Sequence, residues 1–394
     1  MRLESIRERE AACFLPVVKR LPVALVSGRG SRVVDVAGRE YVDLTAGWGV
    51  TSIGHCHPAL VEAIHAQAGR LMQTTNIVYT LPQLDLAERL ARLTGRALPR
   101  AFFVSSGAEA MDGALKLAHR ATGRARFVST RQSFHGRTLL ALAVTGQAKH
   151  QDPYRALLLE GSVVPYDDLA AARGAIDART AAFVVEPVQG EGGVNTPRAG
   201  YLAGLRALCD AAGALLVLDE IQTGIGRTGR MFGYEHDGVT PDVMTLGKGL
   251  GGGFPIAAFL CTEAVARTVS RGDHGGTYAG NPLAGAAAEA VLHVIEAEKL
   301  AERAAELGAH VEARLRAFAA EHPDRVVDVR GKGLLLGVEL RDGDRAAALA
   351  LRALERGVLI NVAAGTVFRL FPALNIPEDD LFPALETVLA LMAD

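Results

Sequence analysis

The sequence is poor in cysteine and has no paired cysteine motif. Its four cysteines are Cys13, Cys56, Cys209 and Cys261, and no two of them stand in CxxC spacing. This argues against a disulfide framework and against a zinc or redox site built on cysteine pairs. Such cysteine usage is typical of a reducing compartment, so we expect a cytoplasmic protein.

Long apolar runs and an excess of one sign of charge are also absent. No run approaches the roughly 18 apolar residues needed to span a bilayer. The charged segment of residues 1–10 lacks the apolar centre of a secretory signal. With a formal net charge of −2, we expect neither nucleic acid nor an anionic membrane as a partner.

What the sequence does contain is the composition of a large globular protein. It has 394 residues, of which 49% are hydrophobic and 22% charged, too many for one small core. From about residue 83 to 290, helical patterns alternate with short apolar runs. The predicted strands are residues 101–104, 126–129, 162–165, 181–185, 214–218, 243–246 and 257–261. Uniformly apolar strands are covered on both faces, so the pattern predicts an α/β domain with a mostly parallel sheet of about seven strands.

The two ends of the chain have a different pattern. Residues 35–44 indicate a hairpin that turns at Ala37-Gly38. A long Ala/Glu/Leu-rich helical stretch runs to Glu321, followed by strands near residues 326–329, 333–340 and 367–371 and a helix from Glu378. We therefore predict a smaller α+β domain of residues 285–394. Residues 1–48 would join it, and residues 49–284 would form the large domain.

Lys248 and Asp219 carry the strongest chemical signal. Lys248 lies in a glycine-rich turn after a predicted strand, and Asp219 ends the apolar run 214–218. The carboxyl ends of parallel strands meet at one edge of a sheet, where ligands bind. A lysine that forms a Schiff base with an aromatic aldehyde, and an acid that keeps a pyridine nitrogen protonated, suit pyridoxal 5'-phosphate (PLP). Taken alone, Lys248 would be a solvated loop residue and Asp219 a turn cap.

Two segments are candidates for holding the phosphate. Ser106, Gly107 and Ala108 follow a strand and open a helix, where free N–H groups and the helix dipole favour an anion. Thr277 offers a hydroxyl among glycines. A plain helix cap and a plain glycine-rich turn are the alternatives for these two segments.

Four residues are candidates for contacting the ring of the cofactor. Phe134 and His135 follow the predicted strand 126–129, and an aromatic side chain there stacks on one ring face or belongs to the core. Ile221 would pack under the ring, and Gln222 would hydrogen-bond its oxygen.

Three similar-looking motifs do not support other functions. Residues 224–229 match GxGxxG but lie away from a strand, and no apolar helix follows. Gly247-Lys248 lacks the first glycine and the Ser/Thr of a P-loop. His55-Cys56-His57 has no second ligand pair, so we expect no metal.

Taken together, the chain resembles the class III (ω-amino acid) aminotransferases of PLP fold type I, and within them the acetylornithine/ornithine branch. The resemblance extends from about residue 23 to 383. The segments that carry it are Gly54–Pro58, Ser106–Ala110, Phe134–Thr138, Val185–Gly193, Leu218–Gly224, Gly247-Lys248 and Thr277–Pro282.

The resemblance implies a role for each matching position. Lys248 would bind the cofactor and then transfer protons, Asp219 would hold the pyridinium, and Phe134 would stack. Thr277 looks like the residue that such enzymes lend across a dimer interface, so a homodimer with active sites at the interface is implied.

The resemblance also implies how substrates are held. Arg137 would anchor a substrate carboxylate, and Glu186 would pair with Arg369 in one half-reaction and release it in the other. Trp48 stands in a loop that lines the substrate pocket of relatives, where acetylornithine enzymes usually have an aliphatic residue. Its bulk would reshape the donor site.

The implied activity is a ping-pong transfer of the terminal amino group of an ω-amino donor to 2-oxoglutarate. N-acetylornithine is the donor that the resemblance favours, which would place the enzyme in arginine biosynthesis. 4-Aminobutyrate, ornithine, lysine and diamines are alternative donors. An intramolecular aminomutase and a non-catalytic protein of the same fold are the other classes.

Overall fold

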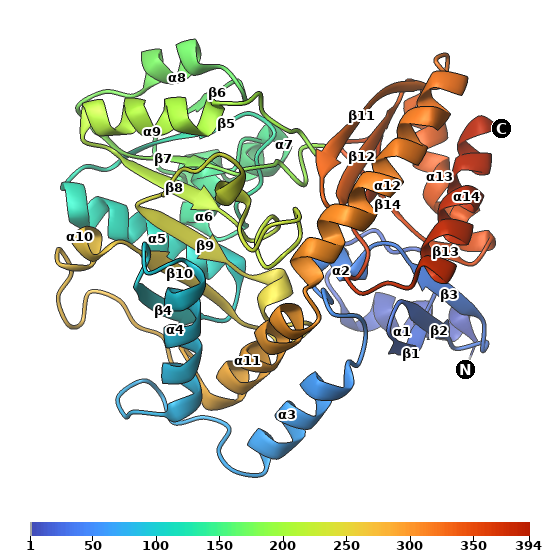
Figure 1. Cartoon of the computed structure of the whole chain (residues 1–394), viewed down its shortest axis with the longest axis horizontal. Coiled ribbons are helices and arrows are strands. Elements are labelled where there is room, and N and C mark those ends of the chain that lie inside the picture. Colours follow the sequence, from blue (N-terminus) through green and yellow to red (C-terminus); the bar gives the residue numbers. More distant parts are fainter. Residues whose placement is uncertain (1) are drawn as a thin grey trace.

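The chain forms two lobes, which we describe from a computed structural model covering residues 2–394 (Figure 1). The larger lobe, which the cyan to yellow part of the chain builds, contains one sheet between layers of helices. The smaller lobe combines the blue N-terminal strands with the orange and red C-terminal part. Among residues 2–394, no helix has both the length and the apolar character that crossing a membrane requires.

The sheet of the larger lobe has seven strands in the order β4-β10-β9-β8-β7-β5-β6. Their bounds are β4 (Arg100–Val104), β10 (Ala257–Cys261), β9 (Val243–Leu246), β8 (Leu215–Asp219), β7 (Thr180–Val185), β5 (Arg126–Thr130) and β6 (Gly161–Val164). β10 is antiparallel to both neighbours, and the other neighbouring strands are parallel. The predicted α/β class and all seven predicted strands are confirmed. The five inner strands are almost completely buried, as predicted, whereas the edge strands β4 and β6 are partly exposed.

Helices cover this sheet on both faces. The helices that pack on its strands are α4 (Leu81–Leu93), α5 (Gly107–Thr122), α6 (Leu139–Val144), α8 (Leu169–Ala175) and α9 (Tyr201–Ala212). The other helices of this lobe are α3 (Pro58–Ala68), α7 (Ala148–Gln151), α10 (Glu263–Ala266) and α11 (Pro282–Ala297), with 3-10 turns η1 (Asp152–Leu157), η2 (Gly233–His236) and η3 (Lys248–Leu250). α5 packs across β7, β9 and β10, so its first turn lies beside the carboxyl end of β8. α11 packs on α3 and α4.

The smaller lobe has two four-stranded sheets. One has the order β1-β2-β3-β13 and the other β11-β12-β15-β14. The strands are β1 (Leu25–Arg29), β2 (Arg32–Asp35), β3 (Glu40–Asp43), β13 (Val358–Leu359), β11 (Val326–Lys332), β12 (Leu335–Leu340), β15 (Val367–Leu370) and β14 (Asn361–Ala363); the helices are α1 (Leu3–Cys13), α2 (Ala46–Gly49), α12 (Leu300–Glu321), α13 (Gly343–Glu355) and α14 (Glu378–Ala393). β3 pairs in parallel with β13, so the N-terminal strands share a sheet with the C-terminal part.

The structure adds elements that we did not predict. The long helical stretch divides into α11 and α12 because Lys299 adopts a left-handed φ of 51° between them. α13 and the short strands β13 and β14 had no distinct sequence signal. The predicted hairpin is present as β2 and β3, with Gly38 at a φ of 82° in the turn. The domain boundaries at residues 48 and 284 stay a prediction.

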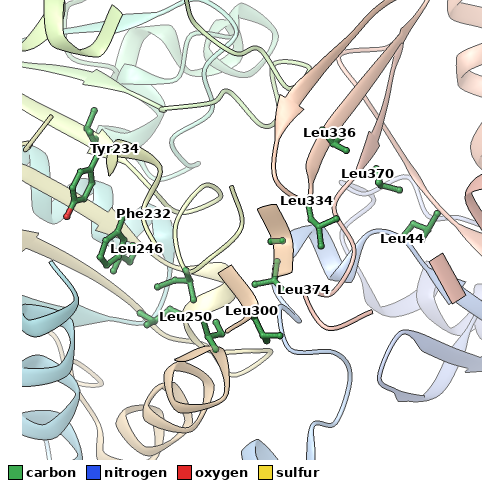
Figure 2. Close-up of a cluster of buried hydrophobic side chains, with 14 of the residues drawn as sticks. Leu44, Phe232, Tyr234, Leu246, Leu250, Leu300, Leu334, Leu336, Leu370 and Leu374 are labelled. Atoms are coloured by element: carbon green, nitrogen blue, oxygen red, sulfur yellow. The ribbon is translucent and has the colours of Figure 1, made fainter. Parts of the chain in front are cut away.

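Buried leucines join the two lobes. Leu250, Leu300, Leu334 and Leu374 are fully or almost fully buried and lie near one another where the lobes meet (Figure 2). Leu250 comes two residues after Lys248, and Leu374 follows β15. The packing between the lobes therefore reaches the turn that carries the predicted catalytic lysine.

Candidate active site

A cavity of about 270 Å³ lies at the carboxyl end of the central strands. The predicted residues that line it are Gly107, Ala108, Phe134, His135, Arg137, Glu186, Asp219, Ile221, Gln222 and Lys248. Gly136 and Glu191, which we did not predict, line it as well. A larger apolar cavity of about 380 Å³ lies between α5 and residues 269–274, and it contains none of the predicted site residues.

Asp219 is the last residue of β8 and is almost completely buried. Its Oδ1 accepts hydrogen bonds from the backbone N–H of Ile221 (3.0 Å) and the hydroxyl of Thr245 (3.3 Å). Its Oδ2 accepts one from Nδ1 of His135 at 2.6 Å. Burial lowers the pKa of His135, but the hydrogen bond to Asp219 and its charge outweigh this effect and raise the pKa overall. The pair therefore holds a fixed carboxylate at the floor of the cavity.

Lys248 begins the turn η3 after β9, and its side chain faces the same cavity. Its backbone φ of 42° lies in the left-handed region, which a non-glycine residue adopts only at a cost. Among residues 2–394, no hydrogen bond or ion pair holds its Nζ. Burial lowers the pKa of Lys248, partly opposed by Glu191. A lowered pKa leaves a larger fraction of the amine unprotonated at neutral pH, and only the unprotonated amine acts as a nucleophile or base.

The first turn of α5 leaves two backbone N–H groups free beside this cavity. Ser106 and Glu109 form a capping box, in which Glu109 N–H donates to Ser106 Oγ and the Glu109 carboxylate accepts from Ser106 N–H. The N–H groups of Gly107 and Ala108 have no partner within the described part of the chain. Unpaired N–H groups at a helix start bind anions, so this turn suits a phosphate.

Phe134 and Ile221 lie on different segments and both line the cavity. The backbone N–H of Phe134 donates to Glu186 Oε1 at 3.0 Å, which ties the Phe134 turn to the end of β7. Ile221 packs so closely on Gly107 that a Cβ there would lie 2.8 Å from Ile221 Cδ1. Glycine at position 107 is therefore what allows the helix start and Ile221 to meet.

These residues together fit PLP. The chemistry of the donor set is complete: a free amine on Lys248, a buried carboxylate on Asp219, unpaired N–H groups at Gly107 and Ala108, and an aromatic side chain at Phe134. Each type of group on the cofactor, namely aldehyde, pyridine nitrogen, phosphate and ring, thus has a matching protein group.

The predicted pairing of Glu186 with Arg369 is wrong. The completely buried guanidinium of Arg369 pairs with Glu191, with Nη1 2.7 Å from Glu191 Oε1. Glu186 instead accepts from the N–H groups of Phe134 and Gly190, and burial raises its pKa to about 7. Burial also raises the pKa of Glu191, but Arg369 outweighs this effect and lowers it overall. Glu186 therefore holds loops together, and Glu191 is the acid that covers the arginine.

Other groups hold Arg369 in place. Asn361 Oδ1 accepts from its Nε (3.1 Å) and Nη2 (2.8 Å), and Gln222 Oε1 accepts from Nη1 (3.1 Å). The ring of Phe371 lies 4.3 Å from its Cζ. We missed Glu191 and Asn361 because no local pattern distinguishes Glu191 from Glu186, and Asn361 becomes a neighbour only through the pairing of β14 with β15.

Three other predicted site residues lie at the edge of the cavity or outside it. Arg137 is exposed at the edge of the cavity and forms no ion pair within residues 2–394. Trp48 is also exposed, at a left-handed φ of 64° in α2, and does not line the cavity. Thr277 lines a separate cavity with Glu109 and Lys116. The contributions of Trp48 and Thr277 to the site stay predictions.

Glu220, next to Asp219, makes folding stability depend on pH. Its carboxylate accepts from Gly233 N–H (2.9 Å), Tyr234 N–H (2.8 Å) and the Thr223 hydroxyl, yet burial raises its pKa from 4.5 to about 7. The folded state keeps a proton that the unfolded chain releases, so this stability is full below about pH 4.5 and is lost as the pH rises through about 7. From pH 5 to 8, wild type should lose on the order of 2 kcal/mol relative to Glu220→Gln.

Urea unfolding of both proteins at several pH values measures this difference. Glu378→Gln, at an exposed position of α14, is the control and should follow wild type. A difference between wild type and Glu220→Gln that stays constant with pH would contradict the assignment.

Comparisons with known proteins agree on one family. The family model described as aminotransferase class-III matches residues 15–391. The acetylornithine aminotransferase of Methanosarcina acetivorans is 44% identical over 381 residues, which cover 96% of this chain and 94% of that protein. A solved ornithine aminotransferase from Toxoplasma gondii, with partial occupancy of PLP at its active site, is similar with a TM-score of 0.94 and 34% identity, covering 99% of this chain and 94% of that one. The acetylornithine aminotransferase of Elizabethkingia anophelis gives a TM-score of 0.88 at 32% identity, covering 100% and 99%.

Proposed function

Because this chain belongs to the class-III aminotransferase family, we propose that it transfers the terminal amino group of N-acetylornithine to 2-oxoglutarate by a ping-pong mechanism. The family and the fold make it a PLP-dependent aminotransferase of fold type I. The observation that carries the finer proposal is a pair of arginines: Arg137 lines the Lys248 cavity, and Arg369 contacts two of its lining residues, Glu191 and Gln222. Arg137 is free and exposed, whereas Arg369 is buried beneath Glu191.

When bound, PLP supplies an electron-poor ring that stabilises negative charge on the carbon bearing the amino group. The protein supplies the proton chemistry. The Nζ atom of Lys248 would take a proton from that carbon and deliver it to the carbon that carries the aldehyde of the cofactor. Its lowered pKa leaves more of the amine unprotonated for the first of these transfers. Asp219, held in place by His135 and Thr245, keeps a negative charge at the floor of the cavity.

The two arginines explain how one cavity serves two carboxylate substrates. An ω-amino donor must bring its terminal amine to Lys248 while its carboxylate lies far away, near the free Arg137. A 2-oxoacid such as 2-oxoglutarate brings its α-carboxylate close to the reacting carbon, where Arg369 becomes available once Glu191 turns away. Bidentate pairing with a guanidinium gives each carboxylate a defined orientation. An intramolecular aminomutase has no need for this division.

Single-turnover reactions of the holoenzyme with separate amine donors test the proposal. We expect fast conversion by N-acetylornithine and by glutamate. Arg137→Gln should lower kcat/KM for N-acetylornithine by roughly 10- to 100-fold, because a hydrogen-bonded ion pair is lost. Putrescine has no carboxylate and is the matched control, so its rate should change little. Equal losses for both donors would contradict the role of Arg137.

Trp48 favours a second candidate, the same chemistry on another donor. It is exposed on the strained turn α2, which contacts η3 next to Lys248. The alternative donors are 4-aminobutyrate, ornithine, lysine and diamines. If one of them is converted while N-acetylornithine is inert, Trp48→Ile should restore N-acetylornithine turnover. If Trp48→Ile does not restore this turnover, Trp48 does not determine the choice of donor.

We also propose that the protein is a cytoplasmic homodimer that lends Thr277 across its interface. The exposed apolar residues Ile77, Tyr79 and Leu81 support this, and Gln73 from the same segment donates a hydrogen bond to the Thr277 carbonyl. Light scattering should give twice the chain mass of 41.5 kDa. Thr277→Ala should weaken PLP binding, as equilibrium dialysis would measure. A monomer that is fully active would contradict both statements.

A further inference from the structure

Arg227 is a buried cation without an acid. Its side chain is almost completely buried, and burial alone lowers its pKa to about 9. Nη1 donates to the carbonyl oxygens of Leu334 (3.1 Å) and Pro372 (2.6 Å). Nη2 is buried with no hydrogen-bond partner, and no carboxylate pairs with the guanidinium within residues 2–394. Burying an arginine without a counter-ion costs folding free energy. The contacts of Arg227 with the two carbonyl groups therefore point to a role for this residue.

The two carbonyl groups belong to the part of the smaller lobe that carries Arg369. Leu334 directly precedes β12, and Pro372 lies two residues beyond the end of β15. These strands are paired with Gly337 opposite Arg369. Arg227 itself comes from the loop that directly follows Asp219 and contains Ile221 and Gln222. One guanidinium therefore spans the cofactor side of the site and the strands that hold the substrate arginine.

The backbones of the two lobes also touch at this point. Leu334 N–H donates to the Arg227 carbonyl at 3.1 Å. Gly333 adopts a φ of 54°, and a Cβ on it would lie 2.5 Å from the carbonyl carbon of Thr228. A Cβ on Gly308 of α12 would lie 2.3 Å from the Gly333 oxygen. With Leu334 and Leu374 packed alongside (Figure 2), this contact has little room to shift.

We propose that Arg227 is a positioning residue that sets the place of Arg369 relative to Lys248. The proposal rests on the function proposed above, in which Arg369 binds the α-carboxylate of the oxoacid. Nη1 of the rigid, planar guanidinium reaches both carbonyl groups, whereas a lysine ammonium is a point charge on a flexible stem and does not fix the same geometry. Losing either contact frees the turn at Leu334 or the end of β15. Misplacing a substrate-binding group by about 1 Å lowers rates by up to about 100-fold.

A residue that only stabilised the fold would affect both half-reactions alike. A residue that positions Arg369 affects the half-reaction that uses Arg369 and spares the one in which Arg137 holds the donor. The test compares holoenzymes of wild type, Arg227→Lys and Arg227→Gln. If one of the two variants folds poorly, the other can still be measured. Arg230→Lys, at an exposed position of the same loop, is the matched control, and Arg369→Lys is the reference.

Each holoenzyme is first reacted in a single turnover with its best ω-amino donor. The aminated enzyme is then reacted with 2-oxoglutarate, and the rate of each step is measured. The dissociation constant for PLP and the Tm are measured beside them. We expect the Arg227 variants to slow the 2-oxoglutarate step about 10- to 100-fold, with the donor step and PLP binding nearly unchanged. Arg230→Lys should behave as wild type, and Arg227→Lys should add little to Arg369→Lys.

Equal loss in both half-reactions, weaker PLP binding that accounts for the loss, or no loss at all would overturn the inference. If Arg369→Lys slows the 2-oxoglutarate step selectively and the Arg227 variants do not, the inference alone fails. If Arg369→Lys itself shows no selectivity, the two-arginine scheme fails and the inference fails with it.

Discussion

Lys248→Ala should lower kcat/KM with the best amine donor by on the order of 10⁴-fold or more, because it removes both the covalent attachment point and the proton carrier. Lys248 is the one amine in the Asp219 cavity of the described chain. A water molecule in its place has neither the basicity nor the fixed position of Nζ. The loss should appear in both half-reactions, since each needs a proton moved between the substrate carbon and the cofactor.

The measurement is single-turnover kinetics together with the absorbance of bound PLP. Lys248→Arg keeps a positive charge but cannot attach the cofactor, and it should be as inactive as the alanine variant. Lys19→Ala, at an exposed position, should match wild type. Turnover that persists in Lys248→Ala would show that the chemistry has been assigned to the wrong residue.

Asp219→Asn should lower kcat by about 10²- to 10³-fold, the range found when one electrostatic contact to developing charge is removed. The amide has nearly the same shape but no negative charge to keep a pyridine nitrogen protonated. It also turns an N–H₂ group toward either His135 or the Ile221 N–H, both of which donate to Asp219 in the wild type. One of the two hydrogen bonds is therefore lost.

PLP titrations and Tm measurements separate this electrostatic effect from misfolding. Asp379→Asn, at an exposed position of α14, is the control for the substitution itself. His135→Gln should give a smaller loss than Asp219→Asn, because the carboxylate stays and only its orientation and charge balance change. An Asp219→Asn enzyme within a few-fold of wild type would rule out a catalytic contribution from the Asp219 charge.

The large sheet was predictable because its signals are local. Each of the seven strands is a mainly apolar run bounded by turn residues, and the five inner strands are almost completely buried. Since catalytic residues of such sheets follow the strands, Asp219 and Lys248 could be placed at one edge from their positions in the chain. The start of α5 was predictable for the same reason, because its capping residues lie within four positions of one another.

Contacts between distant segments were not predictable in the same way. From the sequence, either Glu186 or Glu191 could pair with Arg369, because both acids belong to the motif Val185–Gly193. The path of β15 across the loop after β7 decides that Glu191 meets the guanidinium. Nothing in the local sequence distinguishes the two acids.

The sequence by itself determined the type of fold, the cofactor chemistry and the residues at the ends of the strands, because burial, turn formation and helix capping depend on neighbours in the chain. The tertiary structure alone decided which acid covers Arg369, that His135 holds Asp219, and that Arg227 joins the two lobes. These contacts join residues far apart in the chain. Their geometry arises only when the lobes pack together, so no periodicity or spacing in the sequence encodes them visibly.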